Sequence, residues 1–158
     1  MMRLGLSVAA LAITLTLGFG PSAVLHAHDA AHFSAGEPGD PKKPARTIEI
    51  VMKEEYGAME YVPNRVEVKR NEQIRFVLKN VDIQTHEFLL ASKADNEKHA
   101  AVMKKNPEME HDDPNGKTLP PKGTAEVLWR FNKRGTFEFA CLIPGHREAG
   151  MVGTVSVK

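Results

Sequence analysis

The chain lacks several residue types and motifs, and each absence excludes a class of function. A single cysteine among 158 residues rules out an internal disulfide and a dinuclear copper centre, which would need a second cysteine. Lysine and arginine number 21 against 20 aspartate and glutamate residues, so no charge excess points to nucleic acid or to an anionic membrane. The sequence also contains no glycine-rich phosphate loop and no serine-centred nucleophile elbow.

The first residues carry the pattern of an export signal. Arg3 provides a positive charge, residues 4–19 are apolar and uncharged, and residues 20–23 break the run. A bilayer span needs about 20 apolar residues, so this stretch is at the short end for a membrane anchor. We expect cleavage after Ala27, which makes residues 1–27 a signal peptide and the mature protein periplasmic. A lone cysteine in such an oxidising compartment is expected to be shielded or bound to metal.

The remaining sequence predicts a leader followed by one domain. Residues 28–46 are rich in Ala, Gly, Pro, Asp and Lys and show no apolar period, so we expect a flexible, histidine-containing leader. Apolar residues then alternate with polar ones over short segments, beginning with Ile48, Ile50 and Met52. The length suits a single domain, which we place at residues 47–158.

Most of this domain is predicted to be β-structure. Alternating segments recur up to the C-terminus, where Phe137, Phe139 and Cys141 fall on one face of a strand. If that face belongs to the core, the cysteine sulfur points inward at the end of the domain. Short strands separated by turns predict an all-β fold, a Greek-key β-sandwich with one short helical insertion.

The helical insertion is predicted from its capping residues. Ser92 can cap the N-terminus of a helix over residues 92–105, and Pro107 marks its end. Residues 108–121 are polar and contain proline and glycine, which indicates a loop. Residues 132–135 are expected to form a hairpin turn between two late strands.

The segment between the last two predicted strands carries three metal-ligand types. Four residues separate Cys141 from His146, and four more separate His146 from Met151. A thiolate, an imidazole and a thioether, joined by a second imidazole, form the site that holds copper in electron-transfer proteins. Structural zinc suits them less because methionine is a poor zinc ligand, and a Cys–His nucleophile would need a third, orienting group. Each residue alone has a simpler role in packing or at the surface, but the three together favour copper.

The second imidazole has several candidates, among which position favours His86. This residue lies between two predicted strands, which would place it at the same end of the sandwich as the cysteine loop. The alternatives are His99 and His111 in the polar insertion and the histidines of the leader.

Residues 136–158, together with His86, resemble the cupredoxin (type 1 copper) family. Their ligand intervals are closer to those of rusticyanin-like members than to those of plastocyanin. The segment Met109–Pro114 and the histidine-containing leader are similar to periplasmic cupredoxins found with bacterial copper-tolerance systems. The resemblance implies one Cu(I)/Cu(II) ion and no enzymatic activity, because four protein ligands leave no open coordination position. It implies these ligands: His86, Cys141 and His146 in the equatorial plane, and Met151 axial.

Two functions fit such a site, and copper tolerance is preferred. Soft and imidazole side chains outside the loop could bind additional, weaker copper; they are His28, His32, His99, Met103, Met109 and His111. The alternative is an electron-transfer shuttle whose partner docks on an apolar patch made by Leu142, Ile143 and Pro144. In both cases we expect a monomer that binds copper, with a transient redox protein as the partner of a shuttle.

Overall fold

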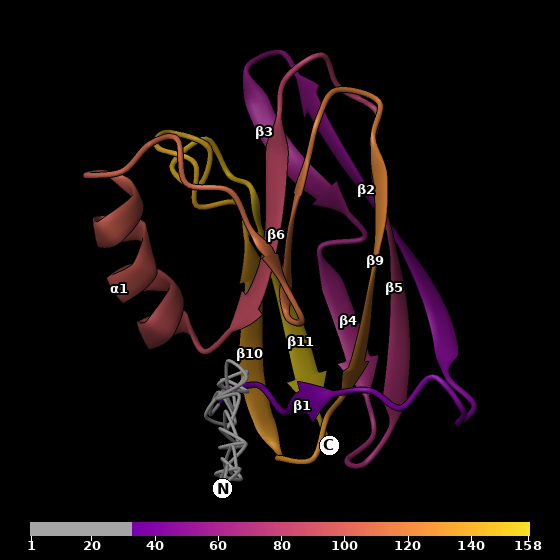
Figure 1. Cartoon of the computed structure of the whole chain (residues 1–158). Coiled ribbons are helices and arrows are strands. Elements are labelled where there is room, and N and C mark those ends of the chain that lie inside the picture. The colour runs from indigo at the N-terminus through magenta and orange to yellow at the C-terminus, as the bar shows by residue number, and fades with distance from the viewer. Residues whose placement is uncertain (1–32) are drawn as a thin grey trace, which may run out of the picture. The chain divides into compact units, whose positions relative to one another are not determined.

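The computed structural model describes residues 33–158, which form a sandwich of two β-sheets with one helix beside it (Figure 1). The first sheet has the strand order β1-β9-β5-β2-β3 and the second β4-β11-β10-β6-β8-β7. This confirms the all-β sandwich with one short helix. The strands are β1 (Glu37–Pro38), β2 (Arg46–Glu55), β3 (Ala58–Val62), β4 (Arg65–Val68), β5 (Gln73–Asn80), β6 (His86–Ala91), β7 (Asp112–Asp113), β8 (Gly116–Leu119), β9 (Thr124–Arg130), β10 (Gly135–Ala140) and β11 (Val152–Val157).

The core lies between the sheets because each sheet turns the apolar side of its alternating strands inward. In the first sheet Ile50 and Phe76 are fully buried, and in the second Phe88 and Phe139 are fully buried. The rings of Phe88 and Phe139 are stacked with their centroids 5.2 Å apart. Cys141 belongs to this same core cluster, as its place on the face of Phe139 predicts.

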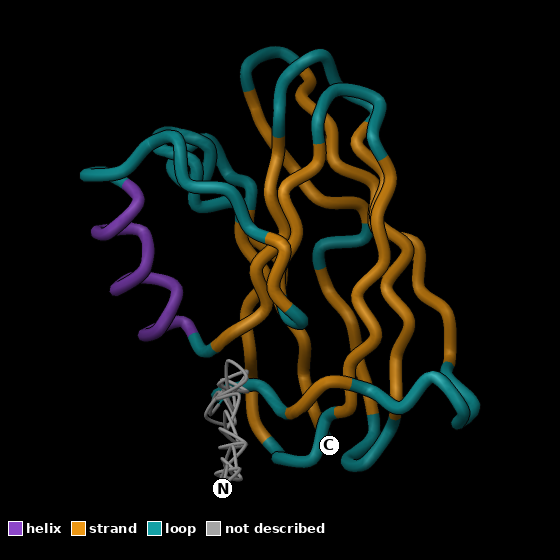
Figure 2. Tube along the Cα trace, in the orientation of Figure 1, coloured by secondary structure: helices purple, strands orange, loops and turns teal. Residues whose placement is uncertain are grey.

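The helix α1 (Lys93–Met103) packs against β6 and β10 on the outer side of the second sheet (Figure 2). Ser92 caps it as expected, because its side chain accepts a hydrogen bond from the backbone N–H of Asp95 at 3.1 Å. Met103 is buried in a small second cluster with Leu89 and Leu142. In the part of the chain that the structure describes, no helix has the length and apolar character needed to span a bilayer.

Two predictions about connections are wrong. Residues 108–121 are not only a loop, because they contain the short antiparallel pair β7–β8, which extends the second sheet at its edge. Residues 132–135 do not close a hairpin, since β9 lies in the first sheet and β10 in the second. They carry the chain from one sheet to the other, a step that turn residues alone do not distinguish from a hairpin.

The expectation of a flexible leader is wrong for residues 33–46. Phe33 packs edge-on against Trp129 with ring centroids 5.1 Å apart, and the Trp129 indole N–H donates to the carbonyl of Ala35 at 3.1 Å. Between them and β1 lies Gly36, with φ +138°, where a Cβ atom would meet the carbonyl oxygen of Arg130 at 2.3 Å. The segment therefore belongs to the sandwich, while the predicted signal peptide and the start of the leader lie outside the described residues.

Candidate metal centre

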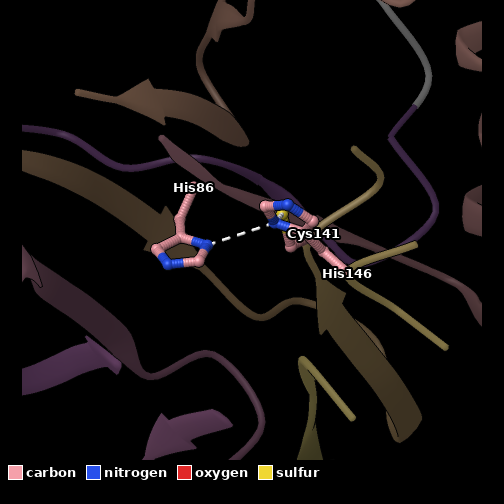
Figure 3. A group of neighbouring side chains, drawn as sticks. All are labelled: His86, Cys141 and His146. Atoms are coloured by element: carbon pink, nitrogen blue, oxygen red, sulfur yellow. Dashed lines mark hydrogen bonds between the residues drawn. The ribbon is translucent and has the colours of Figure 1, made fainter. Parts of the chain in front are cut away.

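Antiparallel pairing of β6 with β10 brings the first ligand candidates together. His86 begins β6 and Cys141 directly follows β10, so the two residues lie at the same end of the second sheet. His146 lies in the loop from β10 to β11. Its Nδ1 is 3.2 Å from Nδ1 of His86 and 3.4 Å from Sγ of Cys141. Figure 3 shows the two rings joined by this nitrogen–nitrogen contact, with the Cys141 sulfur overlapping the His146 ring in the view.

The loop that carries His146 is folded back by its own backbone. Gly145 adopts φ +94°, a conformation that favours glycine, and the N–H of His146 donates to the carbonyl of Ile143 at 3.0 Å. The N–H of Met151 donates to the carbonyl of His146, and the N–H of Cys141 donates to the carbonyl of Met151, both at 3.1 Å. Met151 is consequently fully buried in the same core cluster as Cys141.

Asp82 orients the ring of His86. Its Oδ2 lies 3.0 Å from Nε2 of His86, and the His86 side chain is fully buried. An ionised carboxylate only accepts hydrogen bonds, so Nε2 carries the proton and Nδ1 keeps its lone pair. That lone pair faces His146 and Cys141. Asp82 was not among the predicted residues, although its position four residues before a candidate ligand is a signal of such a role.

Burial disfavours a charge on Cys141 and on His146. It raises the pKa of the Cys141 thiol to about 12, so at neutral pH the thiol is protonated. Burial also lowers the pKa of His146, and a positive charge on His86 would lower it further. A neutral imidazole has a lone pair available, whereas a metal ion must displace the thiol proton.

The donor set fits a single copper ion. With metal–nitrogen bonds of about 2.0 Å and metal–sulfur bonds of about 2.3 Å, ligand atoms in a trigonal plane lie roughly 3.5–3.7 Å apart. The ligand atoms of His86, Cys141 and His146 all lie within 4.8 Å of one another before any adjustment to an ion. Among the described residues, this is the one group of three such side chains within that distance.

Glu87, the residue after His86, supports the cysteine from the side of β6. Its backbone N–H donates to Sγ of Cys141 at 3.3 Å, and its carboxylate accepts from the backbone N–H of Leu142, also at 3.3 Å. The other carboxylate oxygen accepts from the hydroxyl of Thr118 at 3.3 Å. Burial raises the pKa of Glu87, and the charge of His111 opposes that shift. Glu87 thus contacts both the thiol and the residue next to it.

Comparison with known proteins assigns the family. Residues 48–158 match the family described as copper binding proteins, plastocyanin/azurin family. The chain belongs to this copper-binding family. The match confirms copper as the cofactor and the resemblance to cupredoxins.

Two relatives resemble most of the chain. One is the "Copper-resistant cuproprotein CopI" of Rubrivivax gelatinosus, 44% identical over 84% of this chain and 78% of its own. The protein of the same name from Pseudomonas aeruginosa is 34% identical over 92% of this chain and 93% of its own.

Solved structures show the same fold. Auracyanin B matches with a TM-score of 0.63 at 22% identity, over 81% of this chain and 99% of its own. A multicopper oxidase from Campylobacter jejuni matches with a TM-score of 0.55 at 12% identity, over 75% of this chain and 31% of its own. At these identities the likeness concerns the sandwich alone.

The other predicted residues separate into three groups. His99 and His111 do not join the group of His86, Cys141 and His146 but face each other, with their Nε2 atoms 3.0 Å apart. Leu142 is buried, so its predicted place in an exposed docking patch is wrong, whereas Pro144 is exposed and Ile143 is half-buried. His28 and His32 lie outside the described residues.

Proposed function

We propose that the chain is an exported type 1 copper protein that gives copper tolerance by binding excess copper and handling its redox state. The ligands proposed are His86, Cys141 and His146 in a trigonal plane, with Met151 as the weak axial ligand. The observation that carries the proposal is the convergence of one buried thiol and two imidazole nitrogens within 4.8 Å. The names of its relatives, which describe copper-resistant cuproproteins, support the biological role.

The surrounding residues hold this donor set in one geometry. Asp82 fixes the tautomer of His86, and the N–H of Glu87 stabilises the sulfur as it becomes a thiolate. Strand pairing fixes His86 and Glu87, because both lie on β6, which is hydrogen-bonded to β10 on one side and to β8 on the other. Copper bound there would cycle between Cu(I) and Cu(II) with little movement of the protein. Four protein ligands would leave no position for a substrate, which supports a role other than catalysis.

A cavity of about 430 Å³ adjoins the site on the side of His146 and supports copper uptake. Its wall includes His146, Met109, Glu108 and Glu110. Carboxylates raise the local concentration of cations, and a thioether is a soft ligand that suits Cu(I). We place the entry path for copper here, consistent with export to the periplasm, where excess copper is met.

The shuttle function has one observation in its favour. Ile83, one residue after Asp82, is 80% exposed, and Ile143 shares the wall of the cavity with His146. Exposed apolar side chains beside a ligand histidine suit a transient protein contact. We rank this second, because the relatives' names describe copper resistance and the cavity offers acidic and soft side chains.

Two substitutions distinguish these functions in cells. The full chain is expressed in a copper-sensitive bacterium that lacks a relative of this family, and growth is measured against copper concentration. Cys141→Ser is expected to abolish protection, while Ile83→Ser, which removes only an exposed apolar contact, is expected to retain it. Equal loss of protection in both variants would favour the shuttle. Protection that survives Cys141→Ser would contradict the proposal.

A further inference from the structure

A second pair of imidazoles lies away from the centre formed by His86, Cys141 and His146. His99 is on α1, and His111 immediately precedes β7. Their Nε2 atoms are 3.0 Å apart, with the ring planes inclined at 61°. Nitrogens at right angles on one ion, with bonds of about 2.0 Å, would be about 2.8 Å apart. The two rings therefore already stand close to the spacing of two ligands on a single metal ion.

The surroundings of His111 leave its lone pair free on the side of His99. Nδ1 of His111 is 3.1 Å from Oδ2 of Asp113, so the carboxylate accepts a proton-bearing Nδ1–H and Nε2 is unprotonated in the neutral ring. The backbone of His111 is held by Thr118, whose hydroxyl accepts from the His111 N–H and whose own N–H donates to the His111 carbonyl, both at 2.8 Å. A carboxylate behind a histidine is the arrangement that commonly orients metal ligands.

One residue that lines the same cavity has a buried oxygen without a hydrogen-bond partner. Asn96, His99 and His111 all line a space of about 320 Å³ bordered by residues of α1, β6 and β7. Asn96 is fully buried, and its Oδ1 has no hydrogen-bond partner. It lies three positions before His99 along the helix, so the two side chains share a helix face. A buried acceptor left unpaired costs free energy unless a ligand or water satisfies it.

A hydrogen bond from His99 to His111 would explain the short distance between the rings without any ion. The wall of the same cavity, however, also carries the oxygen-bearing side chains of Asp95, Asp113 and Asn115. Met103, one of the residues predicted to bind additional copper, does not complete the site, because it is packed in the apolar cluster beneath the helix. The available donors are therefore nitrogen and oxygen, a set that suits Cu(II) in a tetragonal geometry.

We propose that His99 and His111 bind a second copper ion as Cu(II), without a thiolate, with oxygen donors from the cavity or from water completing its coordination. None of these residues is among the four ligands proposed for the type 1 site. The two assignments can therefore fail separately. The second site would add binding capacity for copper beyond the single coloured centre.

The test is a Cu(II) titration of the mature protein followed by visible absorption and electron paramagnetic resonance (EPR). Absorption reports the thiolate-bound copper, and the EPR hyperfine splitting distinguishes copper without a thiolate. The wild type is expected to saturate its colour at one equivalent and to bind a second, weakly coloured Cu(II). The double variant His99→Ala/His111→Ala is expected to keep the colour and to bind the second copper at least tenfold more weakly.

A matched two-histidine variant controls for the leader. His28→Ala/His32→Ala is expected to retain the second copper, whereas loss of that copper in this variant alone would overturn the proposal. Absence of a second equivalent in the wild type, or its persistence in the His99/His111 variant, would also overturn it. The intense colour shows that each variant is folded, and His99→Gln provides a milder substitution if His111→Ala does not fold. Loss of the colour in the wild type would count against the type 1 site only.

Discussion

The two histidine pairs of this molecule have similar spacing and an orienting aspartate each, but differ in the third donor beside them and in the exposure of their supports. The His86–His146 nitrogens are 3.2 Å apart and the His99–His111 nitrogens 3.0 Å apart. One ring of each pair is bonded to an aspartate, Asp82 in the first and Asp113 in the second. Only the first pair has a buried thiol beside it. Softness of the third donor, rather than spacing of the rings, thus separates the chemistry expected at the two places.

The supports of the two pairs differ in exposure. The side chain of Asp82 is 10% exposed, whereas that of Asp113 is 58% exposed. A carboxylate in water is a weaker and more mobile support than one that is buried. In the first pair His86 begins the central strand β6 and His146 lies in the loop between the paired strands β10 and β11, while the second pair depends on a helix and the two-residue strand β7 at the sheet edge. We therefore expect tight, permanent copper at the first pair and weaker, exchangeable copper at the second.

The largest effect that separates the two pairs is expected from Cys141→Ser. Removal of the sulfur should abolish the intense visible band, because that band needs a thiolate on copper. Copper affinity at this site should fall by more than the roughly 10–100-fold typical of losing a supporting residue. The weakly coloured copper at His99 and His111 should be unchanged. EPR and absorption on the same samples measure both, and loss of both coppers together would show that the pairs are not independent.

The sequence was most informative where the ligands are local. Cys141, His146 and Met151 lie on one loop, so their intervals alone indicated a common site, and strand alternation placed the sulfur inward. His86 required only the inference that two loops meet at one end of a sandwich. The family match and the fold confirm the copper-binding cupredoxin. The exact ligand set stays a prediction.

Features that depend on distant packing were missed. The two residues of β1 are too few to show alternation. Trp129, which packs against Phe33 and holds this segment, lies more than 90 positions away in the sequence, so nothing local distinguished the segment from a leader. Met103 was predicted, like His99, to bind additional copper, but it is packed in the apolar cluster with Leu89 and Leu142. His111 is positioned next to His99 by the β7–β8 pair, a segment whose polar residues had predicted a loop.

A smaller effect, confined to the first pair, is expected from Met151→Leu. The volume is nearly conserved in the core, so stability should fall by less than about 1.5 kcal/mol. Loss of the axial thioether should destabilise Cu(II) relative to Cu(I) and raise the reduction potential, with about 59 mV for each tenfold change in their affinity ratio. Voltammetry of the coloured protein measures the shift. An unchanged potential would show that Met151 is a core residue and not a ligand.

The smallest effect is expected at Glu87, the residue that lies between the two pairs. Its backbone bonds to Cys141, and its carboxylate lies 4.0 Å from Nε2 of His111. Glu87→Gln keeps the backbone contact and the side-chain shape but removes a charge. The carboxylate charge stabilises Cu(II) more than Cu(I), so its removal should raise the reduction potential of the coloured copper. A lost interaction of about 1 kcal/mol corresponds to a rise of roughly 40 mV. The second copper should bind about tenfold more weakly.

Glu126→Gln serves as the matched control for Glu87→Gln, since Glu126 forms an exposed ion pair with Arg75 on the first sheet. This control variant should change neither the reduction potential of the coloured copper nor the affinity for the second copper. A shift in only one of the two signals for Glu87→Gln would assign the carboxylate to that pair alone. A shift in both would show that the two pairs, although they share no ligand, are coupled through one buried charge, so that filling the second site would alter the redox behaviour of the first.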